Sequence, residues 1–278
     1  MVPWERKQAT RRSAQVEPDI RYTVQFQDNG WLLALPVGVE PTPEQQAYMR
    51  RWTLGPPYDD SYTFDRLAAE LRVAGGAELG RLTLRVPLTS ARGEPIEVDE
   101  IRPVDIRRTA PYAGTLVNVP PQDSGTTLKM MFDLDEIEPR ARVAVEGDDL
   151  QPRPGGLFFQ GKTLTLNDRE DVLMIRSITT THAVSFDIRI DYRIRNKPGH
   201  LLVTNNGRPF AVTPMNCLHG AKAKPTPAAA TEARNPALPP VPVEVTRGPA
   251  AYRHAWELSD SRLVEAADPG HVESHACA

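Results

Sequence analysis

The chain has 278 residues, of which 40% are hydrophobic and 25% charged, so it is long enough to bury one large core or two smaller ones. Its formal net charge of −3 excludes the global positive field of a protein that binds nucleic acid through the phosphate backbone. Proline, at 27 residues, is more frequent than in ordinary globular proteins, and much of the excess lies beyond residue 220.

The N-terminal segment, residues 1–19, is rich in Arg and Lys, and we interpret it as a flexible basic arm. It lacks the apolar stretch of a secretory signal, and the sequence contains no run of about 18 apolar residues. We therefore expect a cytoplasmic protein with no membrane span. The alternative is a cell-envelope ectodomain from which a signal or an anchor has been removed.

Residues 20–78 are expected to form a small N-terminal extension of mixed α and β structure. Apolar and polar residues alternate over residues 22–26, and an apolar run occupies residues 31–35. The Asp-Asn-Gly sequence between these stretches is typical of a tight turn, so the pattern predicts a β-hairpin.

Two short helices are expected in the same extension. Thr42 is a favourable N-cap residue and Pro43 suits the first helical position, so a helix is predicted from here to Trp52. Over residues 63–74, apolar side chains recur at helical spacing, and two glycines follow as a stop signal.

Alternation with a period of two dominates residues 79–216. The clearest example runs from Val184 to Arg195, where every even position is apolar and every odd position is polar. One buried and one solvated face is typical of antiparallel sheets, and no helix of crossover length separates the strands. We therefore predict a mainly β fold built on an antiparallel, immunoglobulin-like β-sandwich, with a closed antiparallel barrel as the alternative.

The C-terminal part is expected to consist of a linker and a tail. Residues 217–250 are rich in Pro and Ala and poor in large apolar side chains, which predicts a disordered linker. Within residues 251–278, apolar positions that include Trp256 and Leu263 predict a short amphipathic helix. Such a helix is marginal alone in water, so it either packs on the body or binds a partner.

A split set of His and Cys residues near the C-terminus is a candidate metal site, because Zn²⁺ accepts these side chains as ligands. Structural zinc sites normally have closely spaced ligand pairs, so unrelated polar tail residues are the competing interpretation. The candidate ligands are Cys217, His219, His271, His275 and Cys277.

Three acidic clusters, at residues 133–138, 146–149 and 167–171, are candidate loops for Ca²⁺. None of them fits the ligand spacing of a known calcium loop. Ordinary inter-strand turns explain the same residues, because Asp, Asn and Gly are the residues that such turns favour.

The outward side of the strand predicted from Val184 to Arg195 is a candidate interaction surface, since it carries charges of both signs. The competing interpretation is a solvated face with cross-strand ion pairs. The candidate residues are Asp187, Arg189, Asp191, Arg193 and Arg195 on the strand, with Trp256 and Leu263 on the tail.

The sequence contains no nucleophile elbow, phosphate-binding glycine loop, dinucleotide fingerprint or His-Glu-x-x-His zinc motif. We therefore expect no cofactor and interpret the chain as a non-catalytic protein-binding or structural protein whose partner is another protein. The alternative is a metal-dependent hydrolase on a β-sandwich scaffold. The sequence sets no oligomeric state.

Overall fold

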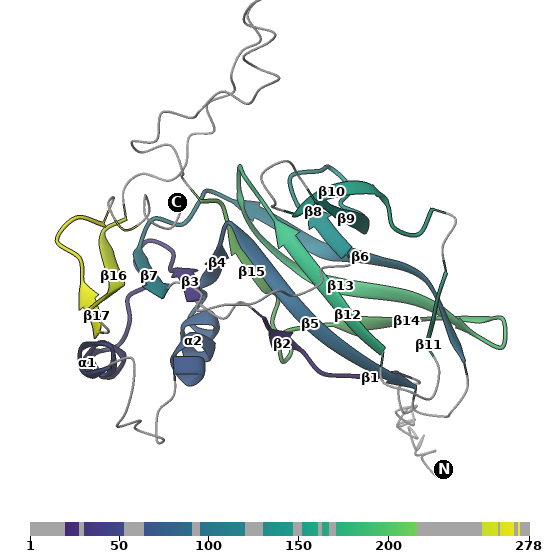
Figure 1. Cartoon of the computed structure of the whole chain (residues 1–278), viewed down its shortest axis with the longest axis horizontal. Helices are drawn as coiled ribbons and strands as arrows, with labels where there is room; N and C mark the ends of the chain where they lie inside the picture. Colours follow the sequence, from purple (N-terminus) through teal and green to yellow (C-terminus); the bar gives the residue numbers. More distant parts are fainter. Residues whose placement is uncertain are drawn as a thin grey trace, which may run out of the picture.

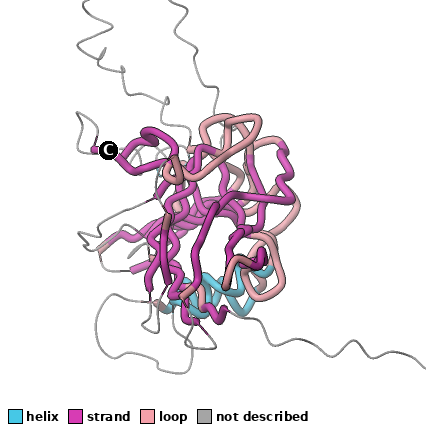
Figure 2. Tube along the Cα trace, turned by 90° about the vertical axis from the view of Figure 1, so that its right-hand side faces the viewer, coloured by secondary structure: helices cyan, strands magenta, loops and turns pink. Residues whose placement is uncertain are grey.

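The computed structural model describes residues 20–27, 31–52, 64–90, 95–119, 130–146, 152–160, 163–166, 171–215, 252–260 and 262–269, together with Val272. Over these ranges the chain is mainly β, with one sheet of 7 strands, one sheet of 10 strands and two short helices. The two sheets overlap in Figure 1, and in both views the helices lie at the lower side of the molecule (Figures 1 and 2).

The 7-stranded sheet is called sheet A. Its strands are β1 (Ile20–Tyr22), β2 (Gln25–Phe26), β5 (Arg81–Ser90), β8 (Met130–Asp133), β9 (Arg142–Glu146), β10 (Pro152–Leu157) and β12 (Asp171–Ile178). Their order is β1-β5-β12-β8-β9-β10, and β2 also pairs with β5. Neighbours run antiparallel except β8 and β12, which run parallel.

The 10-stranded sheet is called sheet B. Its strands are β3 (Trp31–Ala34), β4 (Ala77–Leu79), β6 (Ile96–Thr109), β7 (Thr115–Val119), β11 (Leu164–Leu166), β13 (Ala183–Ile194), β14 (Lys197–Val203), β15 (Phe210–Thr213), β16 (His254–Ser259) and β17 (Arg262–Glu265). Their order is β11-β6-β13-β15-β4-β3-β7-β16-β17, and β14 also pairs with β13. The pairs β4–β15 and β7–β16 are parallel.

Both sheets are therefore mixed, and the prediction of a purely antiparallel fold is wrong. Alternating apolar residues show which face of a strand is buried, but they do not show the direction of the neighbouring strand. The prediction of a mainly β, two-sheet protein is confirmed, whereas its immunoglobulin-like topology stays a prediction.

The main core lies between the two sheets and takes apolar side chains from both. Sheet A contributes residues such as Leu84 and Phe132, and sheet B contributes Phe186 and Phe210. The even-numbered residues of β13 from Val184 to Tyr192 are all buried, so the predicted alternation of this strand is confirmed. The strand ends at Ile194, one residue earlier than predicted.

The longest strand pair is β6 with β13, and its register shifts at two places. Ser185 pairs with Arg107 and Asp187 with Val104, so β6 contains one additional residue there. A second shift lies near Asp99. Each shift is a β-bulge, which changes the direction of the side chains that follow it.

The predicted helices are confirmed as α1 (Pro43–Arg51) and α2 (Phe64–Val73). The N-cap hydroxyl of Thr42 accepts from the backbone N–H of Gln45, whose side chain accepts from the backbone N–H of Thr42 in return. Buried side chains of both helices form a second core cluster with β3, β7, β16 and β17.

The predicted N-terminal hairpin is wrong, because β2 joins sheet A while β3 joins sheet B between β4 and β7. Leu33 and Ala34 are buried on opposite faces of β3, in separate core clusters. Burial on both faces is typical of a central strand, whose partners come from elsewhere in the chain.

The predicted C-terminal helix is also wrong over residues 254–265, which form the antiparallel hairpin β16–β17. Parallel pairing of β16 with β7 and burial of Trp256 outweigh the weak helical preference of an isolated short segment. The basic arm at residues 1–19 and the linker predicted at residues 217–250 lie outside the described residues.

A buried ion pair joins helix α2 to both sheets. Arg72 Nη2 lies 2.7 Å from Glu78 Oε1, and their side chains are only 10% and 5% exposed. The Arg72 guanidinium also lies 3.8 Å from the ring centroid of Phe26 on β2. Glu78 belongs to β4, after which Gly80, with φ of +76°, turns the chain from sheet B into sheet A.

Replacing Glu78 by Ala is expected to lower the free energy of unfolding by about 3–5 kcal/mol, because it leaves the Arg72 charge buried without its partner. Denaturant unfolding measures this loss. The matched control is Arg66→Ala, which breaks the exposed ion pair with Glu70 on the same helix and is expected to cost about 0.5 kcal/mol or less. Equal losses in the two variants would contradict the buried-pair assignment.

Candidate interaction surface

The outer face of β6 and β13 carries charged residues in a fixed arrangement. The strand register places Glu100 opposite Asp191 and Arg102 opposite Arg189, so like charges face each other directly. Directly opposed like charges destabilise a sheet unless other contacts offset them. Contacts between opposite charges do so here, within each strand and diagonally between Arg102 and Asp191.

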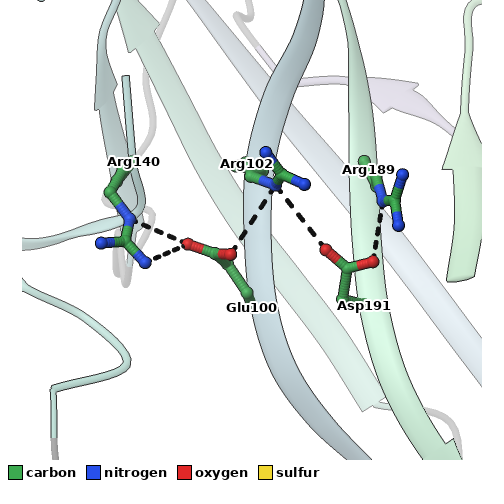
Figure 3. Close-up of polar contacts among 5 residues, drawn as sticks. All are labelled: Glu100, Arg102, Arg140, Arg189 and Asp191. Atoms are coloured by element: carbon green, nitrogen blue, oxygen red, sulfur yellow. Dashed lines mark hydrogen bonds and ion pairs between the residues drawn. The ribbon is translucent and has the colours of Figure 1, made fainter. Parts of the chain in front are cut away.

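These contacts form one connected chain of five charged side chains (Figure 3). Arg140 Nε donates to Glu100 Oε1 at 2.8 Å. Arg102 Nε lies 3.6 Å from Glu100 Oε2 and 3.6 Å from Asp191 Oδ2, so it bridges the two carboxylates. Arg189 Nε donates to Asp191 Oδ1 at 2.7 Å. Positive and negative charges therefore alternate across two strands and a loop.

A second set of contacts surrounds Arg193 on the same face. Its Nε and Nη2 atoms donate to the two carboxylate oxygens of Asp99 at 2.9 and 2.7 Å. Glu97 Oε2 lies 3.3 Å from the same guanidinium. The hydrogen bonds and charge of Asp99, with the charge of Glu97, raise the pKa of Arg193 above its ordinary value. Arg193 is therefore held in one orientation by carboxylates of β6.

We call these residues the charged face. It contains the acidic residues Glu97, Asp99, Glu100 and Asp191 and the basic residues Arg102, Arg140, Arg189 and Arg193. Individual exposed ion pairs add little stability, but a connected set restricts the positions of its members. The face can therefore present an ordered pattern of both charges, without an excess of either.

Asp187 lies outside these contacts, at the point where the neighbour of β13 changes. Phe186 pairs with Phe210 of β15, whereas Ile188 pairs with Val203 of β14. Asp187 Oδ1 is buried and has no hydrogen-bond partner within the described structure. Burial, with a smaller contribution from the charge of Asp105, raises the pKa of Asp187 above its ordinary value.

The remaining predicted surface residues lie elsewhere. Arg195 is in the two-residue turn between β13 and β14, where it has φ of 47° and Asn196 has φ of 62°. Trp256 and Leu263 are only 3% and 1% exposed, in the core cluster beneath α1 and α2. The structure thus brings Arg189, Asp191 and Arg193 together on one face, but not Arg195, Trp256 or Leu263.

The charged face also includes residues that sequence reasoning missed. Glu100, Arg102 and Arg140 come from outside the strand that displayed the clear alternation. Charged residues do recur over residues 97–102, but the bulge near Asp99 interrupts their period of two. The usable signal is the presence of charged residues on two strands that pair with each other, and a pattern taken along one strand does not contain it.

In the acidic cluster at residues 133–138, Asp135 makes hydrogen bonds to another part of the protein. Asp135 accepts hydrogen bonds from the hydroxyls of Thr179, Thr180 and Thr181 at 2.9, 2.8 and 2.6 Å, and from the Thr180 backbone N–H at 2.6 Å. Burial acts to raise the pKa of Asp135, but these bonds outweigh it and hold that pKa below its ordinary value. The carboxylate therefore fastens the turn before β13, which weakens the calcium interpretation of this cluster.

The proposed zinc ligands Cys217, His219, His271, His275 and Cys277 all lie outside the described residues, as does most of the other two acidic clusters. Within the part of the chain that the structure describes, no group of three or more His, Cys, Asp or Glu side chains could hold a metal ion. In the same part, none of the helices has the length and apolar character needed to cross a membrane.

Replacing Asp187 by Asn is expected to raise the free energy of unfolding at pH 7 by about 0.5–1 kcal/mol, a range typical of partly exposed charges. The reason is that folding raises the pKa of this carboxyl, so its charged form destabilises the folded state at neutral pH. That penalty declines as the pH falls through the folded-state pKa and is absent below the unfolded-state value. Denaturant unfolding at pH 7 and pH 3 tests this, and a variant less stable than the parent at pH 7 would contradict it.

The chain was compared with known proteins in three ways. Family models, curated proteins and solved structures all gave no match to this chain.

Proposed function

We propose that this protein is a non-catalytic protein-binding module and that the charged face binds another protein. The observation that supports this most is the connected arrangement of Arg140, Glu100, Arg102, Asp191 and Arg189. Side chains already held in place lose little conformational entropy when a partner binds. A fixed charge pattern also selects partners, since a wrong partner meets like charges.

The balance of charges favours a protein partner over nucleic acid. Each Arg of the charged face contacts at least one carboxylate of the same face. Phosphate backbones are bound by surfaces with an excess of Arg and Lys, and binding releases their counterions. A protein surface can instead match alternating positive and negative groups.

The neighbouring strand β14 adds uncharged surface to this face. Leu202 is 42% exposed and lies opposite Arg189, while His200 lies opposite Asp191 and Pro198 opposite Arg193. Protein interfaces commonly combine apolar side chains with charged and hydrogen-bonding groups. The proposed binding surface therefore extends from β6 across β13 to β14.

A charge-exchange variant tests this proposal without altering net charge. In the variant, Arg189→Asp and Asp191→Arg are combined, and the tagged protein is used for affinity capture from native lysate. A partner recovered by the parent chain is expected to fall at least about tenfold with the variant, because two contacts of the pattern now have the wrong sign.

The matched control exchanges Arg66 and Glu70, which form an exposed ion pair on α2, a helix that contributes no residue to this surface. It is expected to recover the partner as the parent does, and circular dichroism checks that both variants are folded. Equal recovery by parent, charge-exchange variant and control would contradict the assignment of the surface.

The second candidate is a metal-dependent hydrolase on the two-sheet scaffold, with the acidic loops or the region of Cys217 and His219 supplying the ligands. The metal content of the purified chain, measured by mass spectrometry, discriminates between the two functions. Stoichiometric zinc or calcium together with failure to recover any partner would favour the hydrolase.

A further inference from the structure

Strand β7 is uncharged and buried on both faces. All five of its residues, from Thr115 to Val119, are buried, and none is charged. It lies between β3 and β16 in sheet B. Among the described elements, β16 is therefore what covers its second edge. Without β16, β7 would be an uncovered strand edge without charged residues, which is the kind of edge that pairs with another chain.

The C-terminal hairpin covers both sides of this edge. On the side of the helices, the hairpin places Trp256 and Leu263 in the core cluster that contains Met49 and Val117. On the opposite side, Ala255 of the hairpin and the flanking residues Tyr252 and Val272 belong to the cluster that contains Ala34 and Leu116. All five hairpin-segment side chains are at most 3% exposed.

Backbone pairing and one aromatic side chain hold the hairpin in place. Residues 254–257 of β16 pair in parallel with residues 115–118 of β7. The backbone N–H of Arg253 donates to Gly114 O at 3.0 Å, which extends this pairing by one bond. The Arg50 guanidinium of α1 lies 5.5 Å from the centroid of a Trp256 ring. Strand addition with an anchoring side chain is a recurring mode of peptide recognition.

The hairpin is connected to the rest of the chain by residues 216–251, which lie outside the described residues. Met215, just before this connection, and Tyr252, just after it, pack in the same apolar cluster. The contacts with β7 and α1 set the position of the hairpin. The covalent connection, called the tether below, keeps the hairpin at a high local concentration near this edge.

We propose that the β7 edge and α1 form a strand-docking site, which residues 252–272 occupy in cis and which accepts the same segment from a second copy of this chain. The second copy is the occupant because its segment reproduces every contact described above. Since cis and trans occupation use the same contacts, the tether decides between them. Cis occupation dominates in dilute solution, and trans occupation requires release of the resident hairpin. This site is separate from the charged face.

The test uses the full chain with a protease recognition sequence inserted between Ala230 and Thr231. Cleavage there removes the tether and leaves the body and the hairpin unaltered. The probe is a fluorescent synthetic peptide of residues 252–272, titrated before and after cleavage. Because cleavage abolishes the local-concentration advantage of the resident hairpin, the peptide is expected to bind at least about tenfold more tightly afterwards.

Two controls make the result specific. A peptide carrying Trp256→Ala and Leu263→Ala is expected not to bind, since it lacks both buried anchors. In the uncleaved chain, the same two substitutions are expected to weaken the resident hairpin and to allow the native peptide to bind. The proposal is overturned if neither the cleaved chain nor this variant takes up the native peptide, or if the control peptide binds equally well.

Discussion

The pairing of β6 with β13 is the constraint on which both the core and the charged face depend. Because side chains alternate along a strand, the register that buries Phe186 and Ile190 also directs Arg189 and Asp191 outward. The bulge near Asp99 adds one residue to β6, and this residue contacts Arg193. A shift of the ladder by one residue would therefore expose the core and dismantle the charged face together.

Local sequence patterns predicted the elements of the fold better than their pairing. The alternation of β13 and the capping residues of α1 act within a few residues, and both elements are present as expected. The partners of β3 and β16 come from distant parts of the chain. Local spacing therefore could not predict that β3 pairs with β7 instead of β2, or that the C-terminal segment forms strands. In the tail, burial of Trp256 against α1 decided the structure.

For the candidate site too, residues on one strand could be predicted, whereas residues from other segments could not. Arg189, Asp191 and Arg193 lie on one strand, and the period of two was enough to place them together. Glu100 and Arg140 reach the same face from a neighbouring strand and a loop, which only the three-dimensional arrangement reveals. The two proposed binding surfaces also differ in kind: the charged face is a display of side chains, whereas the β7 edge offers backbone hydrogen bonds.

Native-state amide hydrogen exchange tests most directly whether the β6–β13 ladder holds the core and the charged face together. If it does, the amides of residues 186–192 exchange only through global unfolding, with a free energy equal to that from denaturant unfolding. The contrary result is exchange of these amides through a local opening of lower free energy, while β5 and β12 stay protected. It would show that the ladder is a peripheral element and contradict its central role.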